Sequence, residues 1–186
     1  SVAAYRLQLS QSQLEESSRY ARDVLGSHIT QSGFQPDPWQ NQAALPALTS
    51  ETVNIDSMPG DQLGLQRWSR HNCYGNDNPI TDGDGQPTFY LLRARFRVTA
   101  ANNLAISCRY GPGPAQLTTQ INNFGLIDDV ESMQILYAED QDEDDIADDW
   151  VTAQNWHQEH NLQAIKIAIL LSTRQVIDQA VNRQFT

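Results

Sequence analysis

The densest group of side chains able to do chemistry is a short acidic run in the C-terminal half of the chain. Eight of the 23 acidic residues fall within the eleven positions 139–149. Among them, the spacing of four aspartates lets a tight loop turn several oxygens toward one hard cation. A calcium site is therefore one prediction, and a loop of solvated charges is the alternative. The predicted calcium ligands are Asp140, Asp142, Asp144, Asp148 and the carbonyl of Ile146.

The match to the helix-loop-helix calcium motif is only partial. With Asp140 as the first position, the first half of the twelve-residue loop matches well. Asp145 stands at the sixth position, where that motif needs glycine, and Val151 stands at the twelfth, where it needs a bidentate glutamate. The run is therefore no EF-hand. Any calcium site is expected to be a smaller and weaker loop.

Two further groups of residues have a metal-like spacing. His157 and His160 form an HxxH pair, which chelates a metal when it lies on a helix, but no third ligand is evident. Ordinary surface histidines are the simpler interpretation. Asp77, Asp82 and Asp84 lie in a glycine-rich segment whose composition indicates turns rather than a cation site.

The sequence lacks the arrangements that are typical of catalysis. It has no nucleophile elbow, no phosphate-cradling loop and no dinucleotide fingerprint. Twelve basic residues against 23 acidic ones give a net charge of −11, and no basic stripe is evident. Such a surface opposes binding to a phosphate backbone. We therefore expect no enzyme, no small-molecule substrate and no direct nucleic-acid partner.

The two cysteines, Cys73 and Cys108, are either a disulfide or two buried free thiols. The disulfide is favoured, because no second pair exists to complete a zinc site and no CxxC motif suggests redox chemistry. In the loop-closure model, such a bridge stabilises the fold by roughly 3 to 4 kcal/mol. A bridge, together with Lys166 as the only lysine, fits an oxidising compartment.

The first element expected to position these residues is a helix over the first thirty residues. Apolar side chains recur at three- and four-residue steps over 14–29, and Gly33 ends the pattern. Ser12 and Glu15 form a capping box, which predicts a competing, later start. His28 lies on the apolar face and is predicted to be a partly buried packing residue.

After an irregular proline-containing loop at 34–47, the chain is expected to form strands. The segment 92–98 alternates apolar residues with Arg93, Arg95 and Arg97, which predicts a strand with one buried and one solvent-exposed face. The run around Lys166 is apolar enough for a central strand. A helix followed by an antiparallel sheet makes an α+β architecture. The expected strands are 52–55, 62–69, 88–99, 104–110, 132–138 and 163–172, and the tail 174–186 is compatible with a short helix or a strand.

The residues around the acidic run carry a family resemblance. The segments LIDDVESMQILYAEDQDEDDIADDWVTAQNW (126–156) and LQAIKIAILLSTR (162–174) resemble the C-terminal half of PilW-type type IV pilus minor pilins, or minor pseudopilins. The segment LEESSRYARDVLGSHITQSGF (14–34) looks like the part that follows their membrane-inserted helix. The loop of that family has glycines where this chain has Glu143 and Asp145, so a positive φ is harder to reach here.

This resemblance implies a pilin-like fold, with a long N-terminal helix packed on one or more antiparallel sheets. It also implies one disulfide between the cysteine pair, and a single domain divided into helix (1–32), irregular loop (33–50) and mainly β region (51–186). The chain would be a periplasmic domain of a Gram-negative bacterium without its N-terminal membrane helix. Its expected location is the periplasmic face of the inner membrane and the pilus tip, with the inner membrane, other minor pilins and the major pilin as partners.

The leading functional hypothesis is a non-catalytic minor pilin that helps to initiate or cap a type IV pilus. Family filaments support motility, adhesion or DNA uptake. The first alternative is a minor pseudopilin of a type II secretion system, which has the same architecture in another machine. The second is a secreted calcium-dependent binding or adhesion module with no filament role.

Overall fold

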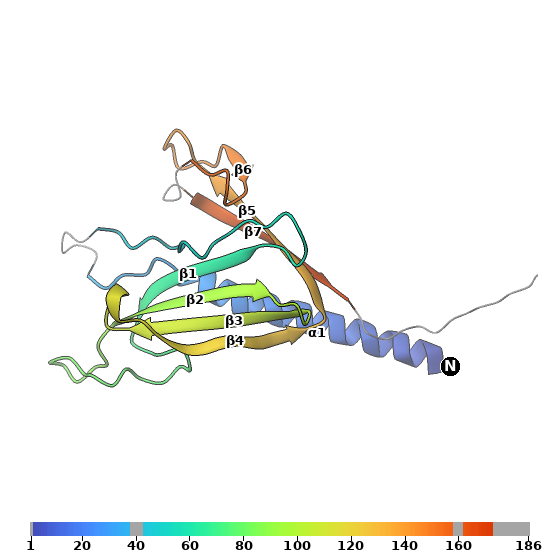
Figure 1. Ribbon diagram of the computed structural model, residues 1–186, viewed down its shortest axis with the longest axis horizontal. Coiled ribbons are helices and arrows are strands. Elements are labelled where there is room, and N and C mark those ends of the chain that lie inside the picture. Colours follow the sequence, from blue (N-terminus) through green and yellow to red (C-terminus); the bar gives the residue numbers. More distant parts are fainter. Residues whose placement is uncertain (1, 38–42, 158–161, 173–186) are drawn as a thin grey trace, which may run out of the picture.

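The computed structural model describes residues 2–37, 43–157 and 162–172. An N-terminal helix, two antiparallel sheets and one disulfide give an α+β architecture (Figure 1). The expected helix or strand at 174–186 lies outside the described residues. Within the described ranges, α1 falls short of the combination of length and apolar character that a bilayer-crossing helix requires.

The helix α1 (Val2–Thr30) confirms the helix predicted for the first thirty residues. It runs without a break past the alternative start at Ser12 and ends before Gly33, whose φ of 75° is left-handed. Ala21 and Leu25, both 4% exposed, bury the C-terminal half of the helix in the core. Tyr5 is 66% exposed, and the first half of the helix projects beyond the sheets (Figure 1).

The first sheet has the order β1-β2-β3-β4 with antiparallel neighbours. In β2, Leu92, Ala94 and Phe96 are buried, so the predicted alternation of a buried and a wet face is confirmed. The intervening arginines lie on the other face. The strands are β1 (Gln62–Ser69), β2 (Tyr90–Val98), β3 (Asn103–Gly111) and β4 (Thr118–Asp128), and the 3₁₀ turn η1 (Pro114–Gln116) connects the last two.

The sequence pattern does not predict β4, for a physical reason. It is an edge strand whose residues are mostly exposed, and Asn122, Asn123 and Gly125 interrupt any apolar alternation. Conversely, the expected strand at 52–55 is reduced to a single bridge between Val53 and Gln62. In both segments, hydrogen bonding of the backbone to a neighbouring strand, and not the pattern of apolar side chains, determines whether a strand forms.

The second sheet has the order β6-β5-β7, with β6 (Asp149–Val151), β5 (Val130–Glu139) and β7 (Leu162–Leu171). The expectation of a central strand around Lys166 is wrong for the described residues, because β7 pairs with β5 alone and forms an edge. Its apolar character has another cause. Ile165, Ile167 and Ile169 are partly buried against the core, while Leu170 on the opposite face is 52% exposed.

Asp61 fixes the start of β1 to the second sheet, although nothing in the sequence distinguishes it from other aspartates. Its carboxylate is 2% exposed and accepts the N–H groups of Ile55 and Ile135, each at 2.7 Å. The preceding Gly60 has a φ of 99°, and a Cβ there would lie 2.2 Å from the carbonyl oxygen of Met133. Only glycine allows this close approach between the two sheets.

Candidate functional site

The acidic run forms the loop of a hairpin between β5 and β6. Glu139 ends β5 and pairs with Asp149 at the start of β6, and the N–H of Asp148 donates to the Glu139 carbonyl at 2.8 Å. Residues 141–150 are all exposed. Glu139 and Asp140, in contrast, are 0% and 2% exposed. The run therefore has a buried acidic stem and an exposed acidic tip.

Asp140 organises the turn at the base of this loop. Its Oδ1 accepts the N–H groups of Glu143 at 2.8 Å and Asp144 at 3.3 Å, and its Oδ2 accepts that of Asp145 at 2.8 Å. The Gln163 side chain on β7 donates to the same Oδ2 at 3.3 Å. One buried carboxylate thus satisfies three consecutive N–H groups, which need a partner wherever water cannot supply one.

Glu143 and Asp145 adopt the left-handed backbone conformation, with φ of 64° and 67°. These are the two positions at which the resembled family has glycine. The sequence predicts only that positive φ is harder to reach here. The structure reaches it at both positions, and the three hydrogen bonds to Asp140 offset the cost of a side chain in this region.

Three of the five predicted calcium ligands come together. Asp140, Asp142 and Asp148 each place a carboxylate oxygen within 4.8 Å of the other two. Asp144 is not in this group, and its Oδ1 instead accepts the N–H of Ile146 at 2.8 Å. No observation tests the carbonyl of Ile146 as a ligand, so that assignment stays a prediction.

The electrostatics of the loop favour a cation. Repulsion by Asp144 raises the pKa of Asp142, with smaller contributions from desolvation and from Asp148. The negative charges are therefore closer together than each carboxylate prefers. A bound cation relieves this repulsion, and so does a proton.

The donor set fits a calcium ion better than a zinc ion, because carboxylate oxygens are hard ligands. Each oxygen of Asp140 already accepts two hydrogen bonds, so a metal at this carboxylate would replace the longer ones, which come from the N–H of Asp144 and the side chain of Gln163 at 3.3 Å each. Calcium takes six to eight oxygens, so three carboxylates need carbonyl or water oxygens to complete the shell. These residues can hold such an ion, and its presence remains a proposal.

The HxxH pair cannot be assessed as a pair, because His160 lies outside the described residues. His157 lies beside the buried end of β5, where its N–H donates to Oε1 of Glu139 at 2.5 Å. Its Nδ1 lies 3.1 Å from Oε2 of the same carboxylate. His157 therefore supports the stem of the acidic loop.

The aspartates of the glycine-rich segment at 76–85 stabilise turns. Asp82 accepts the N–H groups of Asp84 and Gln86 through Oδ1 and contacts Arg70 through Oδ2 at 3.0 Å. Asp77 lies 3.2 Å from Nε2 of His71. Among the described residues these carboxylates do not converge on one point. The interpretation as turns fits this geometry.

Cys73 and Cys108 form a disulfide, so the alternative of two free thiols is wrong. Cys108 lies on β3, whereas Cys73 lies in the irregular segment between β1 and β2. The N–H of Cys73 also donates to the Gln120 side chain on β4 at 3.1 Å. The bridge therefore fastens a segment with little regular structure to the middle of the first sheet.

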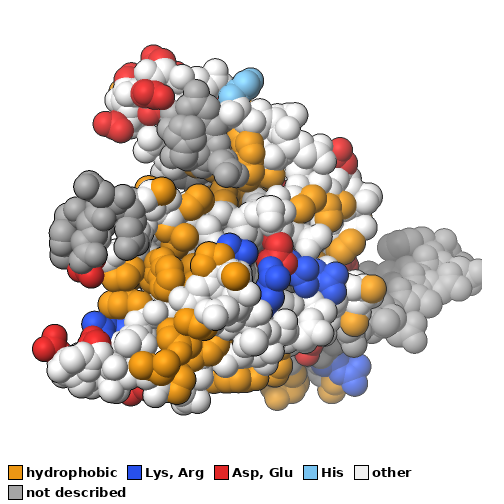
Figure 2. Space-filling view, turned by 60° about the vertical axis from the view of Figure 1, so that its left-hand side comes forward, with side chains coloured by type: hydrophobic (Ala, Val, Ile, Leu, Met, Phe, Trp, Pro, Cys, Tyr) orange, Lys and Arg blue, Asp and Glu red, His pale blue; other side chains and the backbone are white. Residues whose placement is uncertain are grey.

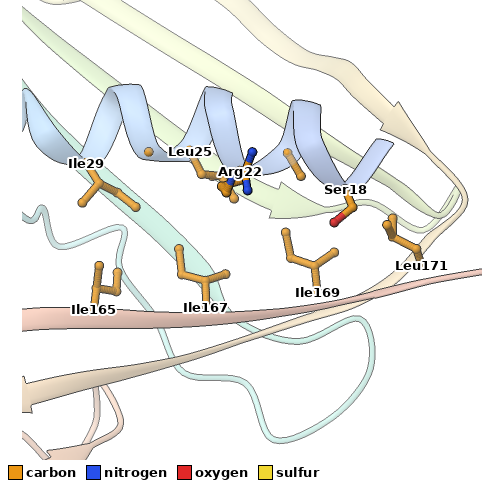
Figure 3. Close-up of a pocket in the computed structure, with 10 residues that line it drawn as sticks. Ser18, Arg22, Leu25, Ile29, Ile165, Ile167, Ile169 and Leu171 are labelled. Atoms are coloured by element: carbon orange, nitrogen blue, oxygen red, sulfur yellow. The ribbon is translucent and has the colours of Figure 1, made fainter. Parts of the chain in front are cut away.

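An apolar groove lies between α1 and β7 (Figure 3). Leu25 and Ile29 of the helix face Ile165, Ile167 and Ile169 of the strand across a volume of about 320 Å³. Ser18 and Arg22 of the helix also line the groove, but most of the lining side chains are apolar, which suits packing rather than chemistry. The groove gives no support to an enzymatic role.

Comparison with known proteins gives one family match. Residues 96–186 match the family described as Type IV Pilus-assembly protein W. This range covers β3 to β7, one disulfide cysteine and the whole acidic loop. No curated protein gives a significant match. No solved structure does so either.

Proposed function

We propose that this chain, whose residues 96–186 match the family described as Type IV Pilus-assembly protein W, is a non-catalytic minor pilin that initiates or caps a type IV pilus. The family match carries the proposal. The pilus assembly role implies contacts with other pilus components and a periplasmic, pilus-associated location. Other minor pilins and the major pilin are the proposed partners, and the chain is proposed to be one pilin-like domain.

The helix α1 supports a place in a fibre. Its C-terminal half is anchored in the core, while its first half carries apolar side chains that are largely exposed. Their exposed fractions are 69% for Val2, 66% for Tyr5, 53% for Leu7 and 42% for Leu9. Val2, Tyr5 and Leu9 share one face of the helix and Leu7 lies on the opposite side, so these side chains lose contact with water when α1 is packed among other helices. We propose neighbouring pilin helices as that partner.

The test is genetic complementation in the source bacterium. Deleting the gene should reduce the number of surface pili counted by electron microscopy, and the wild-type gene should restore it. A Tyr5→Asp/Leu7→Asp variant should fail to restore pili although the purified domain keeps its melting temperature. A Gln8→Asp/Gln11→Asp variant adds the same charge at exposed polar positions of the helix and should complement.

The outcomes also separate the alternatives. Normal pili in the deletion strain, together with loss of protein secretion, would identify a type II secretion pseudopilin instead. Normal pili and normal secretion, together with calcium-dependent binding of the isolated domain to a surface, would identify an adhesion module. Either result would refute the pilus proposal.

We also propose that the acidic loop binds one calcium ion through Asp140, Asp142 and Asp148, as a structural brace. The convergence of their carboxylate oxygens supports this assignment. Titration calorimetry should detect binding to the wild type, and Asp142→Asn should weaken it at least tenfold. Glu143→Gln removes the same charge from outside the group and should weaken binding much less. Equal effects of the two substitutions would show a diffuse ion atmosphere rather than a site.

A further inference from the structure

Four arginines gather on the outer face of the first sheet. Arg93, Arg95 and Arg97 alternate along β2, and Arg109 of β3 lies directly opposite Arg93. Since the intervening residues of β2 are buried, these side chains lie on the face away from the core. All four are partly exposed. We call this surface the arginine face.

The charge of this face is only partly neutralised by its own chain. Glu51 pairs with Arg109 at 2.7 Å and with Arg95 at 3.6 Å. Arg93 and Arg97 instead donate their Nε–H groups to the neutral side chains of Gln66 and Asn123, at 2.9 and 3.0 Å. In the part of the chain that the structure describes, neither arginine has an ion-pair partner.

These contacts leave the terminal nitrogens of Arg93 and Arg97 available to an acceptor. A guanidinium group carries five N–H donors, and each of these two uses only one of them on its neighbour in the described chain. A carboxylate is the acceptor that matches the remaining fork geometry most closely. A strand rises about 3.3 Å per residue, so Arg93 and Arg97, four residues apart on β2, lie roughly 13 Å from each other and can contact different carboxylates of one loop.

The same chain presents such a loop elsewhere. The tip of the acidic run, residues 142–145, consists of four consecutive exposed carboxylates. It projects from the second sheet, and its charges repel one another, as described above. Figure 2 shows basic side chains gathered near the middle of this view, separate from the acidic group at the upper left. Each surface has the charge that the other needs.

We propose that the arginine face of one copy binds the acidic loop of a second copy, head to tail. The contact uses different surfaces on its two sides, so it is heterologous and can repeat along a line of subunits. Because each copy carries a net charge of −11, overall repulsion keeps the contact weak outside an assembly. Subunits already held side by side meet at a high effective concentration, at which a weak contact suffices.

A second copy suits the arginine face better than a nucleic acid does. Four arginines on a strongly negative protein release few counterions, and the remaining surface repels a phosphate backbone. A compact loop presents its charge only to the arginine face. This inference goes beyond the proposed pilus role and can fail while that role stands, because loss of surface pili does not depend on self-association.

The test is sedimentation of the purified protein with two variants that each lose one surface. Arg93→Gln/Arg97→Gln removes charge from the arginine face, and Glu143→Gln/Asp145→Asn removes charge from the loop tip without changing the three carboxylates proposed for calcium. The wild type should form species larger than a dimer as its concentration approaches about 1 mM, where even millimolar contacts are populated. Each variant alone should remain monomeric. Their equimolar mixture should form dimers that grow no further, because it contains one intact face and one intact loop per pair.

The mixture also controls for misfolding, since each variant must be folded to contribute its intact surface. Arg6→Gln/Arg19→Gln removes two exposed arginines from α1 and should self-associate like the wild type. A monomeric wild type, a monomeric mixture, or variants that associate like the wild type would each overturn the proposal. If a labelled DNA duplex binds the wild type but not the arginine-face variant, and the wild type does not self-associate, the partner of the arginine face is a nucleic acid and not a second copy of this chain.

Discussion

At the residue scale, Glu143 and Asp145 stand out because they hold a conformation that glycine reaches more easily. Asp140 makes this conformation stable by accepting three successive N–H groups. The sequence alone predicts the acidic residues and their spacing. It does not predict the turn, because the turn depends on burying one carboxylate at the end of a strand.

A glycine at position 145 should stabilise the protein. Asp145→Gly removes a side chain from a left-handed position and should raise the free energy of unfolding by about 1 kcal/mol. For a chain of this size, that corresponds to a melting temperature about 2 to 4 °C higher. Asp144→Gly removes the same charge where φ is not positive, and it should lower the melting temperature. A similar shift in both variants would attribute the effect to charge instead.

His28 should make stability depend on pH. It packs edge-on against Phe96 and accepts a contact from Arg67 at 3.4 Å. Burial, assisted by the Arg67 charge, lowers the pKa of His28 from 6.5 to about 4. Between these values the unfolded chain binds more protons than the folded chain, so stability is complete above pH 6.5 and is lost as the pH falls toward 4.

Two measurements check the assignment for His28. The imidazole resonances of His28 should titrate with a midpoint near 4 in NMR spectra. In His28→Leu, the loss of stability between about pH 7 and about pH 4.5 should be smaller than in the wild type. A midpoint near 6.5, or an unchanged loss in the variant, would contradict a buried neutral imidazole.

At the scale of elements, the sequence predicts those whose side chains alternate. The helix and the strands at 62–69, 88–99 and 104–110 match the structure closely, because apolar residues mark one face of each. The strand β4 lacks such a mark, and β6 has only three residues. The edge position of β7 is equally hidden, because its isoleucines are partly buried against the core and give an edge strand the composition of a central one.

The disulfide should be a large contributor to stability, because it closes the irregular segment onto β3. Cys73→Ala/Cys108→Ala should lower the free energy of unfolding by roughly 3 to 4 kcal/mol, given a separation of 35 residues. A reductant should lower the melting temperature of the wild type and leave that of the double variant unchanged. Two reactive thiols in the unfolded, unreduced protein would contradict the bridge.

The two halves of α1 should respond differently to mutation. Leu25→Ala leaves a cavity beneath the helix and should cost about 2 to 5 kcal/mol in denaturant unfolding. Leu7→Ala truncates the same side chain at an exposed position and should change stability by less than about 0.5 kcal/mol. Equal losses would mean that the first half of the helix also packs on its own domain.

At the scale of the whole molecule, one core connects the helix and both sheets. Leu25, Phe96 and Met133 belong to it, although they lie on different layers. The contacts of Asp61 and Gly60 with β5 fix the position of one sheet relative to the other. The sequence does not predict these contacts, because no spacing or motif marks Asp61 as a buried residue. Charge is divided instead: arginines line the first sheet, and carboxylates crowd the loop of the second.

This division of charge predicts how salt and calcium act on stability. A net charge of −11 destabilises the compact state through self-repulsion, so raising sodium chloride from about 10 to 150 mM should raise the melting temperature. Calcium chloride at matched ionic strength should raise it further, because an ion bound only by the folded state adds stability by mass action. Asp142→Asn should abolish the additional calcium effect and keep the sodium effect. Equal shifts with both salts in the wild type would indicate screening alone and would leave the acidic loop as a solvated charge cluster.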